Sequence, residues 1–176
     1  MIRKATPNDL DAIESIYDAI HTQEESGEVT IGWIRGVYPT RAIAAAAIQD
    51  ADDMYVMTAD DSDAVVAAAR INQEQVPEYA DAKWEHDAPA DQVMVLHTLV
   101  VDPTAGGHGY GKRFVAFYEQ LALENNCPYL RMDTNARNVR ARALYAKLGY
   151  KEPDIVPCIF NGIPNVQLVC LEKKLG

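Results

Sequence analysis

The chain has 176 residues, of which 48% are apolar and 24% are charged. This length and composition predict a single globular domain, residues 1–176, with a sizeable core. The formal net charge of -10 argues against a nucleic-acid partner, because proteins bind the phosphate backbone chiefly through Lys and Arg. The sequence shows neither an apolar signal segment nor a run long enough to cross a bilayer. We therefore expect a soluble, cytoplasmic protein with no membrane partner.

The cysteines and histidines form no pattern that indicates a metal site. The three cysteines are odd in number and far apart, which fits neither a disulfide framework nor a zinc knuckle. The histidines are equally scattered, and no two of them have the i,i+4 spacing of helical metal ligands. We expect reduced, packed cysteines and no metal. The residues concerned are Cys127, Cys158, Cys170, His21, His86, His97 and His108.

Two helices are predicted in the first third of the chain. Thr6 to Asp9 reads as an N-cap followed by Pro and an acid, and apolar residues then recur at helical spacing from Leu10 to Ile20. Thr40 caps a second predicted helix, Arg41 to Gln49.

Two irregular connections are predicted. Thr22 to Pro39 is punctuated by glycine and carries Trp33 and Tyr38, and long connections inside compact domains are often functional. Gln73 to Asp91 is acidic, has no clear period and reads as a surface loop. We expect Trp84 to pin this loop to the protein; contact with a ligand is the alternative.

Three strands are predicted in the middle of the chain. Tyr55 to Ala59 and Ala64 to Ile71 are apolar runs separated by Asp60-Asp61-Ser62-Asp63, which is typical of a hairpin turn. Val93 to Val101 is almost continuously apolar, which predicts a strand buried on both faces.

The rest of the chain alternates between helix and strand. A helix after Gly111 is expected to end near Asn125-Asn126, and Tyr129 to Asp133 is a short predicted strand. Asn138 to Leu148 is predicted as a helix closed by Gly149.

The chain ends in a predicted antiparallel strand through Val166, Leu168 and Cys170, which follows a turn-like run from Asn161 to Pro164. Together these elements predict an α/β sandwich around a mixed sheet.

A cluster of glycines between the buried strand and the following helix is the strongest chemical signal. Unpaired N–H groups and the helix dipole make such a junction an anion site, and glycine lets the backbone approach a phosphate. A dinucleotide-binding GxGxxG pattern fits only in part, since its third glycine falls on Lys112. Gly106 to Lys112 satisfies GxxxxGK of a P-loop, but Arg113 stands where a Ser or Thr hydroxyl would bind magnesium.

Two longer stretches extend this signal. The first is Leu99-Val-Val-Asp-Pro103 followed by Gly107-His-Gly-Tyr-Gly111, and the second is Asn135 to Tyr150 with its Ala-Leu-Tyr and final Gly-Tyr. Together they closely resemble the signature of the GNAT superfamily of acyl-CoA N-acyltransferases. The resemblance implies a mixed, mostly antiparallel central sheet of about seven strands flanked by about four helices. One position departs from the family pattern, because Gly106 stands where Arg or Gln is usual. Lys112 or Arg113 could compensate.

The resemblance also implies a cofactor site for acetyl-CoA. In the family, a bulged strand presents free N–H groups to the acyl carbonyl and pantetheine, and the loop and the following helix complete the site. The matching residues are Leu99, Val100, Val101, Gly106, Gly107, His108, Gly109, Tyr110, Gly111, Lys112, Asn138 and Tyr145.

Three side chains are candidates for proton transfer. Tyr145 matches the family residue that often protonates the leaving sulfur; packing in the core is its alternative role. His97 and Asp133 are candidate general bases, alone or through water. His97 lies two residues before Leu99, so we expect both to project from the same face of the strand.

The acceptor pocket of this family maps to the connection that contains Trp33 and Tyr38, with a contribution from Phe160 to Pro164. The expected function is direct transfer of an acetyl group from acetyl-CoA to a primary amine of a small molecule or peptide. A non-catalytic acyl-CoA-binding or sensing domain is the alternative. A homodimer is possible.

Overall fold

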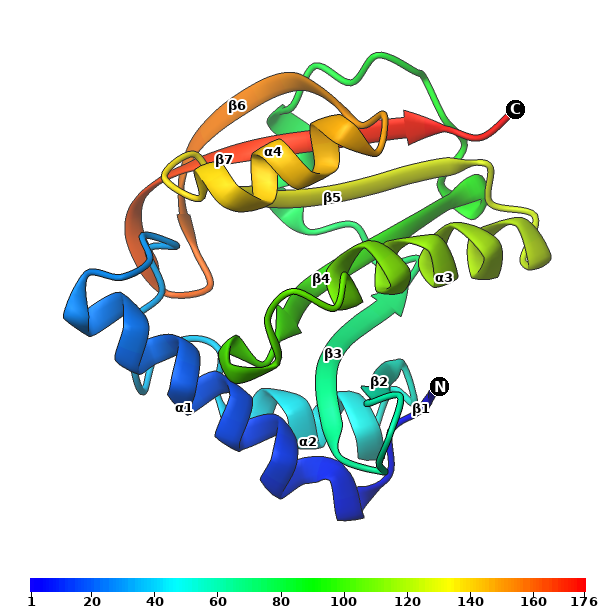
Figure 1. Cartoon of the computed structure of the whole chain (residues 1–176). Helices are drawn as coiled ribbons and strands as arrows, with labels where there is room; N and C mark the ends of the chain where they lie inside the picture. Colours follow the sequence, from blue (N-terminus) through cyan, green and yellow to red (C-terminus); the bar gives the residue numbers. More distant parts are fainter.

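The computed structural model describes all residues, 1–176, and is built around one seven-stranded sheet in the order β1-β2-β3-β4-β5-β7-β6 (Figure 1). Neighbouring strands are antiparallel except β4 and β5, which are parallel. The strands are β1 (Ile2–Lys4), β2 (Met54–Thr58), β3 (Val65–Asn72), β4 (Val93–Val101), β5 (Tyr129–Asn135), β6 (Lys151–Phe160) and β7 (Ile163–Lys174). This confirms the expected mixed, mostly antiparallel sheet.

Four α-helices cover the sheet, two on each face (Figure 1). Phe114, Tyr118 and Tyr145 belong to a core cluster with Leu130 and Val169, so α3 and α4 pack on one face. A second cluster joins residues of α1 and α2 to β2, β3 and β4 on the other face. The helices are α1 (Leu10–Ser26), α2 (Arg41–Gln49), α3 (Tyr110–Glu124) and α4 (Val139–Lys147). The sandwich predicted from the alternating patterns is confirmed.

The first helix is longer than its apolar pattern predicted. It continues through Ser26 and ends at Gly27, whose φ of 80° allows its N–H to reach the carbonyls of Gln23 and Glu24. Polar residues after Ile20 therefore extend the helix, and among them only His21 is buried. The connection predicted to begin at Thr22 begins at Gly27.

The segment between β3 and β4 is anchored by Trp84, as expected. It contains short 3-10 turns at Pro77–Asp81 and Ala90–Gln92. The Trp84 indole N–H donates to the Tyr79 carbonyl at 3.0 Å, and the Arg131 guanidinium lies 4.1 Å from the centre of the indole ring. Arg131 is buried in an ion pair with Glu172. The loop is therefore fixed against β5 and β7.

The last two strands form a hairpin around Asn161 and Gly162, which both have positive φ, as a tight type I′ turn requires. The last strand, β7, spans Ile163–Lys174 and so extends beyond Cys170 at the carboxyl end. None of the helices combines the length and the apolar character needed to cross a bilayer.

Candidate active site

The sheet opens between β4 and β5, its two parallel strands. Their pairing begins at Val93 with Tyr129 and ends at Leu96 with Met132. Beyond that point β4 stays paired with β3, whereas β5 stays paired with β7 as far as Asn135. A gap in the middle of the sheet follows, and both strands supply backbone and side chains to its walls.

A bulge in β4 lies at the start of this gap. Thr98 and Leu99 together face Ala69 of β3, and the register shifts across them. Thr98 has a φ of +53°, which is a strained conformation for a β-branched residue. The Tyr38 hydroxyl forms a hydrogen bond with the Thr98 hydroxyl. The bulge thus connects the strand to the segment after α1.

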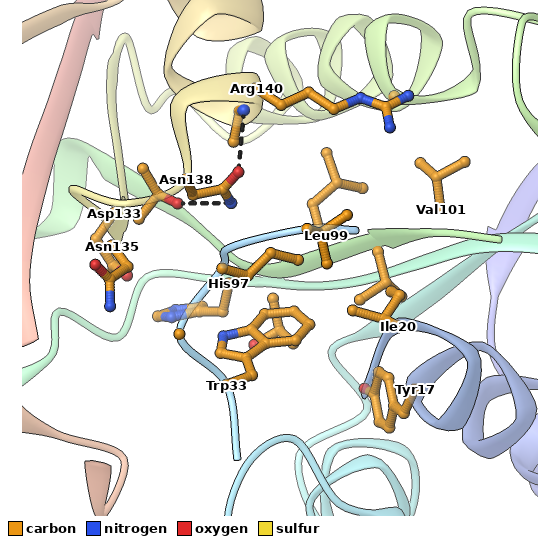
Figure 2. A pocket seen from close by; sticks show the side chains of 18 of the residues that line it. Tyr17, Ile20, Trp33, His97, Leu99, Val101, Asp133, Asn135, Asn138 and Arg140 are labelled. Carbon is orange, nitrogen blue, oxygen red and sulfur yellow. Dashed lines mark hydrogen bonds between the residues drawn. The ribbon is translucent and has the colours of Figure 1, made fainter. Parts of the chain in front are cut away.

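The bulge overturns the expectation that His97 and Leu99 share a face of β4. One extra residue reverses the alternation of side chains, so Leu99 packs with the core under α3 and α4. His97 instead follows Val95 on the opposite face and contacts Asn72 of β3. Figure 2 shows His97 and Trp33 on one side of β4, with Leu99 on the other.

Two of the three expected backbone donors point into the gap. The Asp102 N–H donates to the Val66 carbonyl in β3. Since N–H groups alternate along a strand, the N–H groups of Leu99 and Val101 point away from β3, towards the gap, while that of Val100 points to β3. Val100 therefore differs from the expectation that all three present free donors.

One cavity of about 930 Å³ occupies the gap and brings nearly all the predicted site residues together (Figure 2). His108 and Arg113 lie outside its lining. His108 stacks on Tyr110, and Arg113 forms a two-pronged ion pair with Asp60 at 2.8 Å. The predicted residues in the lining are Trp33, Tyr38, His97, Leu99, Val100, Val101, Gly106, Gly107, Gly109, Tyr110, Gly111, Lys112, Asp133, Asn138 and Tyr145.

The glycine loop leaves an open cradle at the N-terminus of α3. Gly107 and Gly109 have φ values of 89° and 69°, a region that favours glycine, and a Cβ on either would meet no other atom within 4 Å. Gly109 caps α3 without a side-chain hydrogen bond, so the first N–H groups of the helix remain available. The backbone therefore offers donors and space for a phosphate group.

Cationic side chains line the cavity near this cradle although the chain as a whole is acidic. Lys112 and Arg140 line the cavity and have no ion-pair partner, whereas Arg137 lies 3.9 Å from Glu24. Gly106 has an ordinary backbone conformation, with a φ of -64°. Of the two cations considered as substitutes for a side chain at Gly106, only Lys112 faces the cavity.

Tyr145 and Asn138 come from α4. The Tyr145 hydroxyl has no hydrogen-bond partner within the protein, and burial raises the pKa of this phenol, so its proton is retained at neutral pH. Asn138 caps α4, since its Oδ1 accepts from the Ala141 N–H at 3.2 Å, and its Nδ2 donates to Thr134. The cap occupies both ends of the Asn138 amide.

Asp133 of β5 lines the cavity, and a residue far away in sequence donates a hydrogen bond to it. The Tyr79 hydroxyl donates to Asp133 Oδ2 at 2.8 Å. Burial raises the pKa of Asp133 to about 7, and the nearby Glu78 contributes to this rise, while the hydrogen bond from Tyr79 opposes it. A carboxyl group with such a pKa can both accept and release a proton near neutral pH.

His97 is a weaker base than a typical histidine. Burial and the charge of Arg70 lower the pKa of its imidazole to about 4. Its Nε2 lies 2.9 Å from Asn72 Oδ1, whose own amide N–H donates to Asp53. The ring is therefore neutral at physiological pH and binds a proton less readily than Asp133.

The connection after α1 closes one side of the cavity. Glu24 Oε2 and Oε1 accept hydrogen bonds from the N–H groups of Ile31 at 2.5 Å and Gly32 at 3.0 Å, respectively. Trp33 and Tyr38 then meet edge to face, with ring centres 6.0 Å apart. The loop carries these two aromatic rings over the opening between β4 and β5.

Sequence reasoning missed Tyr79 and Thr98. Tyr79 lies in a segment with no periodicity, and its role depends on a contact across 54 positions. A threonine in an apolar strand gives no sign of a bulge. Asp133 was found because it ends a predicted strand beside the second motif.

Comparison with known proteins agrees with this geometry. The chain matches the model of the acetyltransferase (GNAT) family over residues 12–150. A GNAT-family acetyltransferase from Streptococcus agalactiae has the same fold with a TM-score of 0.80 and 23% identity, covering 100% of this chain and 95% of that one. No curated protein matches the sequence.

Two further solved structures share the fold. One is a GNAT-family acetyltransferase from Listeria monocytogenes, with a TM-score of 0.71, 22% identity and coverage of 99% of this chain and 94% of that one. The other is a ribosomal-protein-alanine N-acetyltransferase from Brucella melitensis, with a TM-score of 0.71, 19% identity and 99% coverage of each chain. Since the family model spans most of the sequence, this chain belongs to the GNAT acetyltransferase family.

Proposed function

We propose that this protein transfers an acetyl group from acetyl-CoA directly to a primary amine. The observation that carries the proposal is a single cavity that joins the phosphate cradle of α3 to Tyr145 and Asp133 through the gap between β4 and β5. Membership of the family supports acetyltransferase activity in general. The donor and the acceptor are the parts that experiment must establish.

Backbone groups would hold the donor. The first N–H groups of α3 and the loop at Gly107 and Gly109 suit a pyrophosphate, and Lys112 adds a positive charge beside them. The N–H groups of Leu99 and Val101, which point away from β3, would polarise the acyl carbonyl. When bound, acetyl-CoA supplies an acyl group activated as a thioester.

Two side chains would move the protons. A free alkylamine is mostly protonated at neutral pH, since its pKa is about 10.4, so the acceptor must lose a proton before it attacks. Asp133 Oδ accepts this proton, directly or through water, and its pKa of about 7 suits the task. Tyr145 donates its phenolic proton to the departing sulfur. His97, with a lower pKa, is the second candidate base.

A ligand-dependent melting experiment tests the donor. Acetyl-CoA at about a hundred times its dissociation constant adds roughly 2.7 kcal/mol of stability, while NADH and Mg-ATP at equal concentration add none. No shift with acetyl-CoA contradicts the proposal.

Release of free CoA thiol across a panel of amines then tests turnover. Binding without turnover of any amine would favour the alternative of a non-catalytic sensing domain. The cytoplasmic location and the homodimer stay predictions.

A further inference from the structure

The charged groups of the cavity are unevenly distributed. Lys112 and Arg140, which have no ion-pair partner, come from the first turns of α3 and α4. Figure 2 shows Arg140 and Val101 on the side of β4 opposite Trp33. On the Trp33 side lies the part of the cavity that an acceptor would enter.

Apolar side chains form the walls of this acceptor end. Trp33, Tyr38, Val76 and Phe160 are half-buried, line the cavity, and pack against the third core cluster. They come from three separate segments: the connection after α1, the loop after β3, and the end of β6. Ile163 from β7 belongs to the same cluster and also lines the cavity. These walls favour an apolar ligand, because burial of apolar surface stabilises the complex.

The cations at this end are already close to acidic side chains. The Arg70 Nε donates to both oxygens of Asp53, at 2.9 and 2.8 Å, and its Nη2 donates to Glu74 at 3.0 Å. An acceptor carboxylate would therefore meet two acids around Arg70, and Arg137, the other cation near this end, already lies 3.9 Å from Glu24. Burying a charge without a partner is unfavourable, so anionic acceptors are disfavoured.

The acids at this end are also engaged. Glu74 is paired with Arg70, and Asp133 accepts from Tyr79 and is assigned to the amine that reacts. The third acid near this end, Glu28, is an exposed side chain at the start of the connection after α1. A second ammonium group on the acceptor would lose its hydration against apolar walls without gaining a buried ion pair.

We infer that the acceptor is a primary amine on an uncharged apolar body, alkyl or aryl, and neither an amino acid nor a polyamine. This inference rests on the proposed acetyltransferase function and specifies its substrate class. Discrimination arises in the walls formed by Trp33, Tyr38, Val76 and Phe160, which accept methylene or ring surface and reject a second charge.

Three amines of matched length test the inference: hexylamine, 1,6-diaminohexane and 6-aminohexanoate. Each is offered with acetyl-CoA to the full chain, and thiol release and product mass are measured. We expect kcat/KM for hexylamine to exceed that of both charged analogues at least tenfold. If either analogue reacts as well as hexylamine, the inference is overturned while the proposed function stands.

Peptides and amino acids complete the panel and separate the two hypotheses. Acetylation of these compounds, with none of hexylamine, would also overturn the inference and leave the proposed function intact. An absence of acetylation across the whole panel, with acetyl-CoA bound, would overturn the proposed function and the inference together.

A charge placed in the wall provides the second test. Val76→Asp puts a carboxylate among the apolar side chains, and Val76→Asn is its uncharged control of equal size. We expect the ratio of diamine to hexylamine turnover to rise at least fivefold in the Asp variant relative to the Asn variant. Phe160→Glu and Phe160→Gln make the same comparison on β6 if the variants at Val76 fail to fold. An unchanged ratio in the pair that folds would show that these walls do not select the acceptor.

Discussion

The chemistry of Asp133 depends on its burial and on one hydroxyl group. Asp133 is half-buried and lines the cavity, and the surrounding protein raises the pKa of its carboxyl group to about 7. Tyr79 favours the charged form because its hydroxyl donates to Oδ2 at 2.8 Å. As a base, Asp133 must be deprotonated, so activity is expected to rise as pH increases through about 7.

Tyr79→Phe tests this arrangement. Loss of the hydroxyl removes the donor that lowers the pKa of Asp133, so the acidic limb of the kcat/KM profile is expected to move to higher pH. The acceptor amine titrates identically with both proteins, so a difference between the profiles reports on the enzyme. At high pH the variant is expected to recover most of the wild-type rate. A uniform decrease at every pH would instead indicate structural damage.

The Tyr145 hydroxyl is the candidate acid, because it belongs to the cavity lining, has no hydrogen-bond partner within the protein and carries a proton at neutral pH. Tyr145→Phe is expected to lower kcat about 10²–10⁴-fold, the usual contribution of acid catalysis, with little change in the dissociation constant of acetyl-CoA. Single-turnover kinetics and calorimetric titration measure the two quantities. Tyr55→Phe removes a hydroxyl from β2, outside the cavity lining, and is the matched control. Wild-type turnover in Tyr145→Phe would show that this side chain only packs in the core and does not act as the acid.

At this scale the sequence identified side chains but not their surroundings. Tyr145 and Asp133 could be predicted because each lies at a fixed position relative to a motif. That Asp133 is a better base than His97 could not be predicted, since a histidine normally has the more suitable pKa. Burial and Arg70 lower the pKa of His97, while burial raises that of Asp133. Both effects depend on tertiary packing.

Among the elements, the junction of β4 and α3 determines how the donor is held. Lys112 lies in the cavity lining and has no ion-pair partner, whereas its neighbour Arg113 pairs with Asp60. Lys112 is therefore the residue that can replace the side chain missing at Gly106.

Lys112→Ala is expected to weaken acetyl-CoA binding roughly tenfold, since hydrogen bonds to charged groups contribute about 1.5–3 kcal/mol. The effect is expected to diminish at high salt. Arg113→Ala is the adjacent control and is expected to change the affinity less than twofold. Calorimetric titration at two ionic strengths measures both variants. An equal loss of acetyl-CoA affinity in both variants would contradict the proposal that Lys112 replaces the side chain missing at Gly106.

The elements themselves could largely be predicted, because local chemistry specifies them. Thr40 and Asn138 cap α2 and α4 through their side chains, as their residue types indicated. The bulge at Thr98 could not be predicted, because it depends on the register between β3 and β4. It also reversed the expected face of Leu99, since one extra residue changes every later side chain.

On the scale of the whole molecule, the site lies at the opening that connects the two faces of the sheet. The core beneath α3 and α4 and the cluster containing Trp33 lie on opposite faces, and the gap between β4 and β5 joins them. A donor held on one side can therefore react with an acceptor held on the other. The sequence predicted both halves but not the opening, which depends on where strand pairing stops. The single-domain assignment stays a prediction.

Burial of Asp133 also lowers the stability of the folded protein when the carboxyl group is charged. Its pKa is about 7 in the folded protein against an ordinary value of 3.8, so the folded state binds a proton more tightly than the unfolded state. Stability therefore falls as pH rises from about 4 to 7, by at most roughly 4 kcal/mol. Asp133→Asn removes this penalty while keeping an acceptor for Tyr79.

The Asn variant is therefore expected to be inactive yet more stable than the wild type at pH 8, with the difference disappearing near pH 4. Urea unfolding at pH 4, 5.5 and 8 measures it. Asp61→Asn removes an exposed carboxylate from the turn between β2 and β3 and controls for the loss of one negative charge. A stability difference that is independent of pH would mean that Asp133 titrates normally. In that case the proposed base would lack the environment that suits it to neutral pH.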